Sequence, residues 1–207
     1  MIFIFLGFYK KMEVPTEIFY MNNYTVFNPE DKTIICKDKV LRRRDRPNII
    51  KKYYSEHITF ILQNKSLSDC VNLLFRQVNE LYKGNIDIQG LSTTKRCLNY
   101  KTQTHPMKLL MKRYPYLQPG YVVQYLVMNN GCELRGKRMY LIDDPQVNSL
   151  SLDSSHYIQL LFYSVVKLLQ GAFNMQSVEL LNSVYQCGVT DSTYKKFMEC
   201  YILNKND

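Results

Sequence analysis

The sequence predicts an α+β fold in which helices predominate. Three observations support this prediction: short β-prone segments with turns in residues 1–41, apolar residues at helical spacing in the later parts of the chain, and one strongly β-prone segment, YVVQYLVM, among the helices. Apolar residues make up 46% of the 207 residues, which is enough for a sizeable core. We therefore expect a small β edge over residues 1–41 and a mainly helical domain over residues 42–207 with one inserted β hairpin.

Residues 1–41 are expected to form a hairpin at the edge of a sheet. EIFY, YTVF and TIIC are short β-prone segments, and Asn-Pro-Glu-Asp at residues 28–31 is typical of a turn. The first nine residues are apolar, but a membrane-spanning helix needs about twenty such residues. We interpret them as a buried strand or a non-native start, and we expect no membrane association.

Two helices are expected next, packed as an antiparallel hairpin. Asp45 can cap the first helix, and Pro47 suits its first turn because the missing N–H would have no partner there. Ser66 and Asp69 are spaced as in a capping box at the start of the second helix, and Gly84 is a plausible end. The expected buried stripes comprise Ile50, Tyr54, Ile58 and Ile61 on the first helix and Leu67, Val71, Leu74, Val78 and Leu81 on the second.

The middle of the chain is expected to contain a short helix and the inserted hairpin. His105-Pro106 starts the helix, which ends before Pro115. A Pro-Gly turn leads into the strand at residues 121–128, and Asn-Asn-Gly at residues 129–131 favours a hairpin turn.

The longest helix is expected over residues 155–172, capped by Asp153 or Ser154. Its buried face comprises Tyr157, Leu160, Leu161, Ser164, Val165, Leu168 and Leu169. A further helix is expected from Ser177 to Gly188.

No complete catalytic or metal site is expected in this chain. The six cysteines and three histidines are scattered without a CxxC pair, which is typical of a reduced intracellular protein. The P-loop, GxGxxG, HExxH and GxSxG motifs are absent. Asp143-Asp144 precedes Pro145 and has no third acidic neighbour, so we interpret it as a structural turn and expect no metal or cofactor in this chain.

Charge favours a polyanionic partner. Lys and Arg number 27 against 18 Asp and Glu, and the sequence pI is about 9.2. Residues 37–52 contain eight basic side chains, and residues 88–132 contain no Asp or Glu at all. The basic residues of this second stretch are Lys95, Arg96, Lys101, Lys108, Lys112 and Arg113. Hydroxyl groups interleaved among them suit contacts to a nucleic-acid backbone, although a basic surface without a specific partner remains the alternative.

Several motifs, in order, resemble the C-terminal end of family B DNA polymerases, particularly those of large DNA viruses. The first half of the match comprises KMEVPTEIF as a palm strand, MNNY at the position of the family's KKxY motif, and VLRRRD at the step from palm to thumb. The second half comprises TTK, YK and HP in residues 93–106, QPGYVVQYLVM, DDP, and the closing helix HYIQLLFYSVVKLLQGAF. The match runs from Lys11 to Phe173, but Asn22 and Asn23 stand where the family usually has two lysines.

The resemblance implies a thumb-like domain over residues 42–207 that grips primer-template duplex DNA, preceded by the last strands of the palm. By this resemblance Arg43, Arg44, Lys95 and Lys101 bind phosphates, and Tyr24 and Tyr100 face the sugar edge. The family's nucleotidyl transfer uses two Mg²⁺ ions held by palm aspartates, and no position of this chain matches those aspartates.

Three functions remain open at this point: a polymerase fragment without activity of its own, a subunit of a split polymerase whose partner chain supplies palm and fingers, or a stand-alone DNA-binding protein derived from a thumb. We expect an intracellular location, in the host nucleus or at a viral replication site if the protein is viral.

Overall fold

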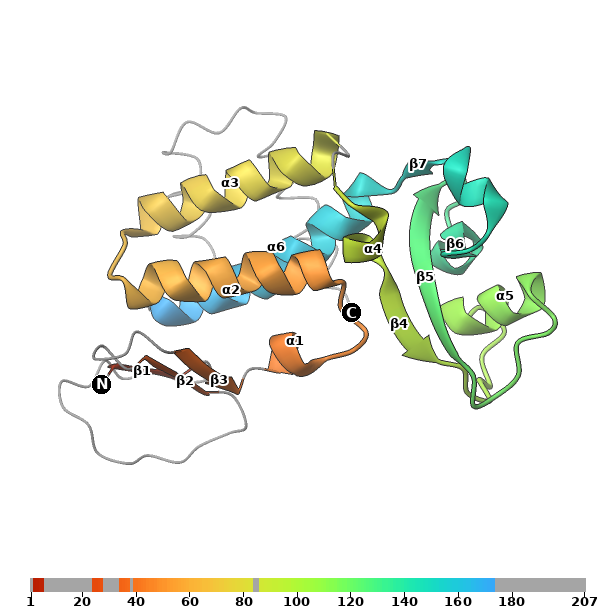
Figure 1. Cartoon of the computed structure of the whole chain (residues 1–207), viewed down its shortest axis with the longest axis horizontal. Coiled ribbons are helices and arrows are strands. Elements are labelled where there is room, and N and C mark those ends of the chain that lie inside the picture. Colours follow the sequence, from red (N-terminus) through yellow and green to blue (C-terminus); the bar gives the residue numbers. More distant parts are fainter. Residues whose placement is uncertain (1, 6–23, 28–33, 38, 84–85, 174–207) are drawn as a thin grey trace. The chain divides into compact units, whose positions relative to one another are not determined.

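The computed structural model describes residues 2–5, 24–27, 34–37, 39–83 and 86–173 (Figure 1). These residues form an α+β structure in which helices predominate, which confirms the predicted fold class. The chain divides into two compact units. The first comprises residues 1–43, 51–79 and 159–207, and the second comprises residues 44–50 and 80–158. The boundary between a palm edge and a thumb at residues 41 and 42 stays a prediction.

A three-stranded antiparallel sheet belongs to the first unit. Its strands lie in the order β1 (Ile2–Phe5), β2 (Tyr24–Phe27) and β3 (Ile34–Lys37). The predicted strands YTVF and TIIC are therefore confirmed, the second with a shift of one residue, and they pair as the expected hairpin. The predicted strand EIFY and the turn at residues 28–31 lie outside the described residues.

A helical hairpin supplies much of the core of the first unit. The single turn α1 (Lys39–Arg42), which was not predicted, is followed by α2 (Asn48–Leu62) and α3 (Leu67–Lys83) (Figure 1). The predicted capping box is present: the Ser66 N–H donates to Asp69 Oδ2 at 3.0 Å, and the Asp69 N–H donates to Ser66 Oγ at 3.1 Å. The predicted stripes are buried except for Ile61 and Leu67, which are half-buried.

The hairpin also encloses a polar cluster that apolar periodicity does not predict. His57 and Gln77 are both fully buried, and His57 Nε2 lies 3.0 Å from Gln77 Oε1. The Gln77 amide donates to Glu56 Oε2 at 2.9 Å, whereas His57 Nδ1 is buried without a partner in the described part of the chain. Burial is the main cause that lowers the pKa of His57 to about 4, against a smaller opposing effect of the Gln77 hydrogen bond.

The long helix α6 (Ser154–Ala172) begins as predicted, and Asp153 is its cap: the His156 N–H donates to Asp153 Oδ1 at 3.1 Å. The predicted face is buried apart from Leu160, which is half-buried. The predicted helix from Ser177 to Gly188 lies outside the described residues, and so does the predicted stop at Gly84. No helix in the described part of the chain is both long and apolar enough to cross a membrane.

A second antiparallel sheet organises the second unit. Its order is β4 (Thr93–Arg96), β5 (Val122–Asn129) and β6 (Met139–Leu141), and β7 (Ser151–Leu152) pairs with the end of β5. Around it lie α4 (Ile88–Leu91), α5 (Pro106–Arg113) and the 3-10 turns η1 (Arg135–Arg138) and η2 (Pro145–Asn148). The predicted strand and short helix are confirmed as β5 and α5.

Two features of this sheet differ from the prediction. β4 was not predicted, because TTKR is polar and basic and its strand geometry comes from pairing along β5, where Lys95 lies opposite Val123. The connection from β5 to β6 is also longer than a tight hairpin turn, since η1 lies between the strands. The structure therefore contains a four-stranded sheet where one hairpin was expected.

Candidate nucleic-acid interface

The predicted DNA-contacting residues fall in both units. Tyr24, at the start of β2, and Arg43, an exposed residue just after α1, belong to the first unit. The second unit holds Arg44, Lys95, Tyr100 and Lys101. Within it, Lys95 lies on β4 and Lys101 is exposed in the loop that leads to α5.

The loop that carries Tyr100 and Lys101 is held by a compact set of interactions. The Tyr100 ring stacks on His105 with centroids 3.8 Å apart and planes 13° from parallel, and its hydroxyl donates to the Arg96 carbonyl at 3.1 Å. Lys108 donates from Nζ to the Tyr100 carbonyl at 3.0 Å. Tyr100 is therefore a half-buried anchor of the loop.

Three of the basic residues in the stretch without acids have structural roles. The Arg96 Nε donates to the Gly120 carbonyl at 3.2 Å, and Lys108 is used as described above. The Arg113 guanidinium donates to the Met139 and Lys137 carbonyls, at 2.7 Å each, and lies 4.0 Å from the centroid of the Tyr140 ring. The remaining basic residues, Lys95, Lys101 and Lys112, are the ones left to face a partner from this stretch.

A close backbone approach brings a further arginine to this region. A Cβ added at Gly136 would lie 2.8 Å from the Pro106 Cα and 2.8 Å from Leu109 Cδ1, so only a glycine allows η1 to pack this tightly on α5. Arg135 directly precedes Gly136, just as His105 directly precedes Pro106. The exposed Arg135 therefore lies beside the N-terminal cap of α5.

Electrostatic effects on two histidines indicate that this region is positive. The pKa of His105 is lowered by burial first and then by Lys95 and Arg135. Burial, followed by Arg135, Arg138 and Arg46, lowers the pKa of His156 to about 3. The charge of Arg135 thus acts on side chains from the α5 cap and from α6.

The pKa of Tyr125, on β5, is affected by Arg135 and also by the carboxylate of Asp45. Burial raises its pKa, the Arg135 guanidinium acts in the opposite direction, and the Asp45 carboxylate raises it further. Arg135 is therefore the cation common to His105, His156 and Tyr125. Sequence reasoning missed it because the basic run at residues 135–138 lies outside the stretch without acids and the glycine contact is not visible in sequence.

The acidic pair at residues 143–144 is used in a turn, as predicted. Asp144 Oδ1 accepts the Gln146 N–H at 2.8 Å and thereby caps η2, and its other oxygen accepts a hydrogen bond from the Tyr114 hydroxyl. Burial and this bond to Asp144 raise the pKa of Tyr114 to about 12. In the described part of the chain, no three His, Cys, Asp or Glu side chains gather to hold a metal.

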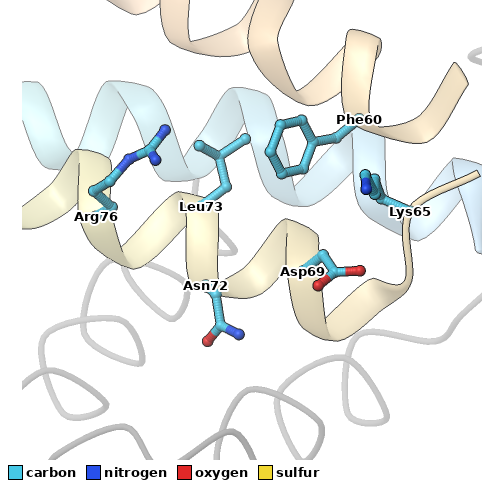
Figure 2. A pocket seen from close by; sticks show the side chains of 6 residues that line it. All are labelled: Phe60, Lys65, Asp69, Asn72, Leu73 and Arg76. Carbon is cyan, nitrogen blue, oxygen red and sulfur yellow. The ribbon is translucent and has the colours of Figure 1, made fainter. Parts of the chain in front are cut away.

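The first unit contains an open hollow between α2 and α3 (Figure 2). It has a volume of about 420 Å³ and is lined by Phe60, Lys65, Asp69, Asn72, Leu73 and Arg76. Lys65 and Arg76 lie at opposite ends of it (Figure 2). Asp69 Oδ2 accepts a hydrogen bond from the Ser66 hydroxyl at 2.7 Å. Its charged groups therefore do not converge on a common point.

Comparisons with solved structures show what the fold of this chain is similar to. No protein-family model matches the chain, and no curated protein matches its sequence. The structure is similar to that of the family B DNA polymerase from the hyperthermophilic archaeon Pyrobaculum calidifontis, with a TM-score of 0.56 and 19% sequence identity. The likeness covers 75% of this chain and 21% of the polymerase, about a fifth of its length. This chain therefore has the fold of part of a family B DNA polymerase.

Proposed function

We propose that this chain is the thumb portion of a family B DNA polymerase and binds the backbone of primer-template duplex DNA. The likeness in fold to part of such a polymerase supports the polymerase relationship. The ordered motifs from Lys11 to Phe173 support the thumb assignment and the type found in large DNA viruses.

The positive surface of the second unit is the observation that carries the DNA-binding proposal. The 45 residues from Ile88 to Cys132 contain no carboxylate side chain. After burial, which is the largest cause, Lys95 and Arg135 both lower the pKa of His105. Cations that replace condensed counterions on phosphates give strong binding with little sequence preference. We therefore assign the phosphate contacts to Lys95, Lys101, Arg43 and Arg44, and the sugar-edge contacts to Tyr24 and Tyr100.

Catalysis is not part of this proposal. The complete polymerase would use Mg²⁺ at palm aspartates, and the described part of this chain offers no cluster of ligands for such an ion. The expected contribution of this chain is grip on the duplex behind the active site.

The direct test is fluorescence anisotropy of the chain on a labelled primer-template duplex across a series of salt concentrations. We expect affinity to fall steeply with salt, and the double variant Lys95→Ala/Lys101→Ala to reduce the log–log slope by roughly two, because each lost phosphate contact removes about 0.9. The pair Arg43→Ala/Arg44→Ala should act similarly.

Lys83→Gln is the matched control, since Lys83 is an exposed cation in the last turn of α3 and has no proposed role. It should leave the slope within about 0.3 of the wild-type value. A folded wild-type chain that binds no duplex at low salt would contradict the DNA-binding proposal.

A second candidate, a subunit of a split polymerase, is favoured by the small sheet of the first unit. In the described residues, β1 and β3 each pair with β2 alone, so each has an edge at which a strand from another chain could add. Such a subunit should form a stable complex with a chain that carries palm and fingers and should restore primer extension to it. A mixture that shows neither complex nor extension would contradict this candidate.

A further inference from the structure

We propose that Arg135, Lys95 and His105 form a discrete site on the second unit that holds one phosphodiester group of the bound duplex. This inference rests on the proposed DNA-binding function and deepens it, because it assigns a contact to Arg135 and His105, and it predicts that one particular phosphate of the duplex occupies the site.

The geometry of the site follows from three elements of the same unit. Lys95 lies on β4, His105 caps α5, and Arg135 begins η1. The tight contact of Gly136 with Pro106 and Leu109 holds η1 against the start of α5. Arg135 directly precedes Gly136, and His105 directly precedes Pro106. The contact between Gly136 and Pro106 therefore fixes the backbone of Arg135 relative to that of His105.

The imidazole of His105 is oriented for donation to an anion. Its Nδ1 accepts the Met107 N–H at 3.2 Å, so in the neutral ring Nε2 carries the proton. Stacking on Tyr100 at 3.8 Å fixes the plane of the ring. Burial, followed by the nearby Lys95 and Arg135, lowers the pKa of His105 and so favours the neutral ring.

The two cations of the site differ from the neighbouring Arg138 in their pairing. Neither Lys95 nor Arg135 forms an ion pair with a carboxylate of the described residues, in contrast to Arg138, which pairs with Asp153. The Asp45 carboxylate acts on Tyr125, and no carboxylate is among the causes that shift the pKa of His105. An arginine fork, an ammonium and an N–H donor together suit the oxygens of one phosphate group.

The first measurement compares Arg135→Ala with Lys137→Ala in duplex binding. Lys137 is an exposed cation two residues further along η1, so the two variants remove the same charge from the same element. We expect Arg135→Ala to weaken binding about tenfold and Lys137→Ala to weaken it less than about twofold. Equal effects of the two variants would overturn the inference, because general positive charge would then explain the binding.

The second measurement locates the phosphate. A set of short primer-template duplexes, each only long enough for one bound chain in one register and each with one neutral methylphosphonate in place of a phosphate, is titrated with the wild type and with Arg135→Ala. In the wild type, each methylphosphonate at a contacted position should lower the affinity for the duplex. In Arg135→Ala, we expect this loss of affinity to disappear at one or two adjacent positions, because the variant already lacks the contact, and to persist at all other positions. Losses that persist at every position would overturn the inference.

His105→Asn and Gly136→Ala extend the test to the other parts of the site. Asparagine keeps a side-chain acceptor for the α5 cap but removes the imidazole N–H and the stacking on Tyr100, so duplex binding should weaken about threefold while the chain stays folded. In Gly136→Ala the added Cβ displaces η1, and the coupling to the single phosphate should be lost. If the wild type binds no duplex, the proposed function itself fails; if it binds but shows no position-specific coupling, only this site is wrong.

Discussion

Replacing Asp153 by alanine should lower the free energy of unfolding by about 3–5 kcal/mol. The Asp153 side chain is only 6% exposed and has two roles: it accepts a hydrogen bond from the Arg138 guanidinium and it caps α6 by accepting the His156 N–H. Removal of the carboxylate leaves Arg138, which is only 26% exposed and whose Nε already lacks a partner among the described residues, without its counter-charge. Urea unfolding followed by circular dichroism measures the loss.

Two further variants separate the ion pair from the cap. Asp153→Asn keeps a good capping side chain and should lose only the charge pairing with Arg138. The variant should therefore lose about 1 kcal/mol less unfolding free energy than Asp153→Ala. The double variant Asp153→Asn/Arg138→Met removes both charges and should recover much of the lost stability, because no unpaired charge remains. An Asp153→Ala protein within about 1 kcal/mol of the wild type would show that the pair contributes little.

Acidification should destabilise the first unit through His57. The pKa of His57 is lowered from 6.5 to about 4 in the folded chain, so the neutral ring is favoured by folding. Stability from this effect is complete above the unfolded pKa and is lost as the pH falls through the window between these two values. We expect a loss of about 2 kcal/mol between about pH 7.5 and about pH 5, measured by urea unfolding at each pH.

The double variant His57→Leu/Gln77→Leu isolates this contribution. It replaces both buried polar side chains by apolar ones of similar size, so His57 no longer titrates and Gln77 is not left without its partner. Between about pH 7.5 and about pH 5, the free energy of unfolding of this variant should fall by about 2 kcal/mol less than that of the wild type. His156, whose pKa is lowered to about 3, also makes the folded chain less stable as the pH falls. This contribution is the same in the wild type and the variant, so it cancels when the two are compared. A wild-type protein whose stability is constant over this range would contradict the assignment.

The helical elements were predictable because their signals are local. The apolar stripes of α2, α3 and α6, the Ser66–Asp69 capping box and the Asp153 cap all depend on spacings of three or four residues along one segment. The strand β5 was predictable for the same reason, since a run of β-branched and aromatic residues follows a Pro-Gly turn.

The candidate interface was predictable only in part. Lys95, Tyr100 and Lys101 were found because they lie in a stretch that contains no acids, which can be read directly from the sequence. The same stretch did not show that Arg96, Lys108 and Arg113 bond to backbone carbonyls, because their acceptors lie 8 to 26 residues away along the chain.

The sequence by itself therefore determined α2, α3, α5 and α6, the caps of α3 and α6, the main strand of the second unit and the basic character of residues 88–132. The predicted cap Asp45 was wrong, because α2 begins three residues later, at Asn48. Only the tertiary structure decided that TTKR is a strand, that Arg135 lies beside His105, and that His57 and Gln77 share a buried hydrogen bond. The physical reason is the range of the interactions. Helix periodicity and capping act within a few residues, whereas strand pairing, the close approach at Gly136 and the burial of a polar pair depend on segments brought together by folding.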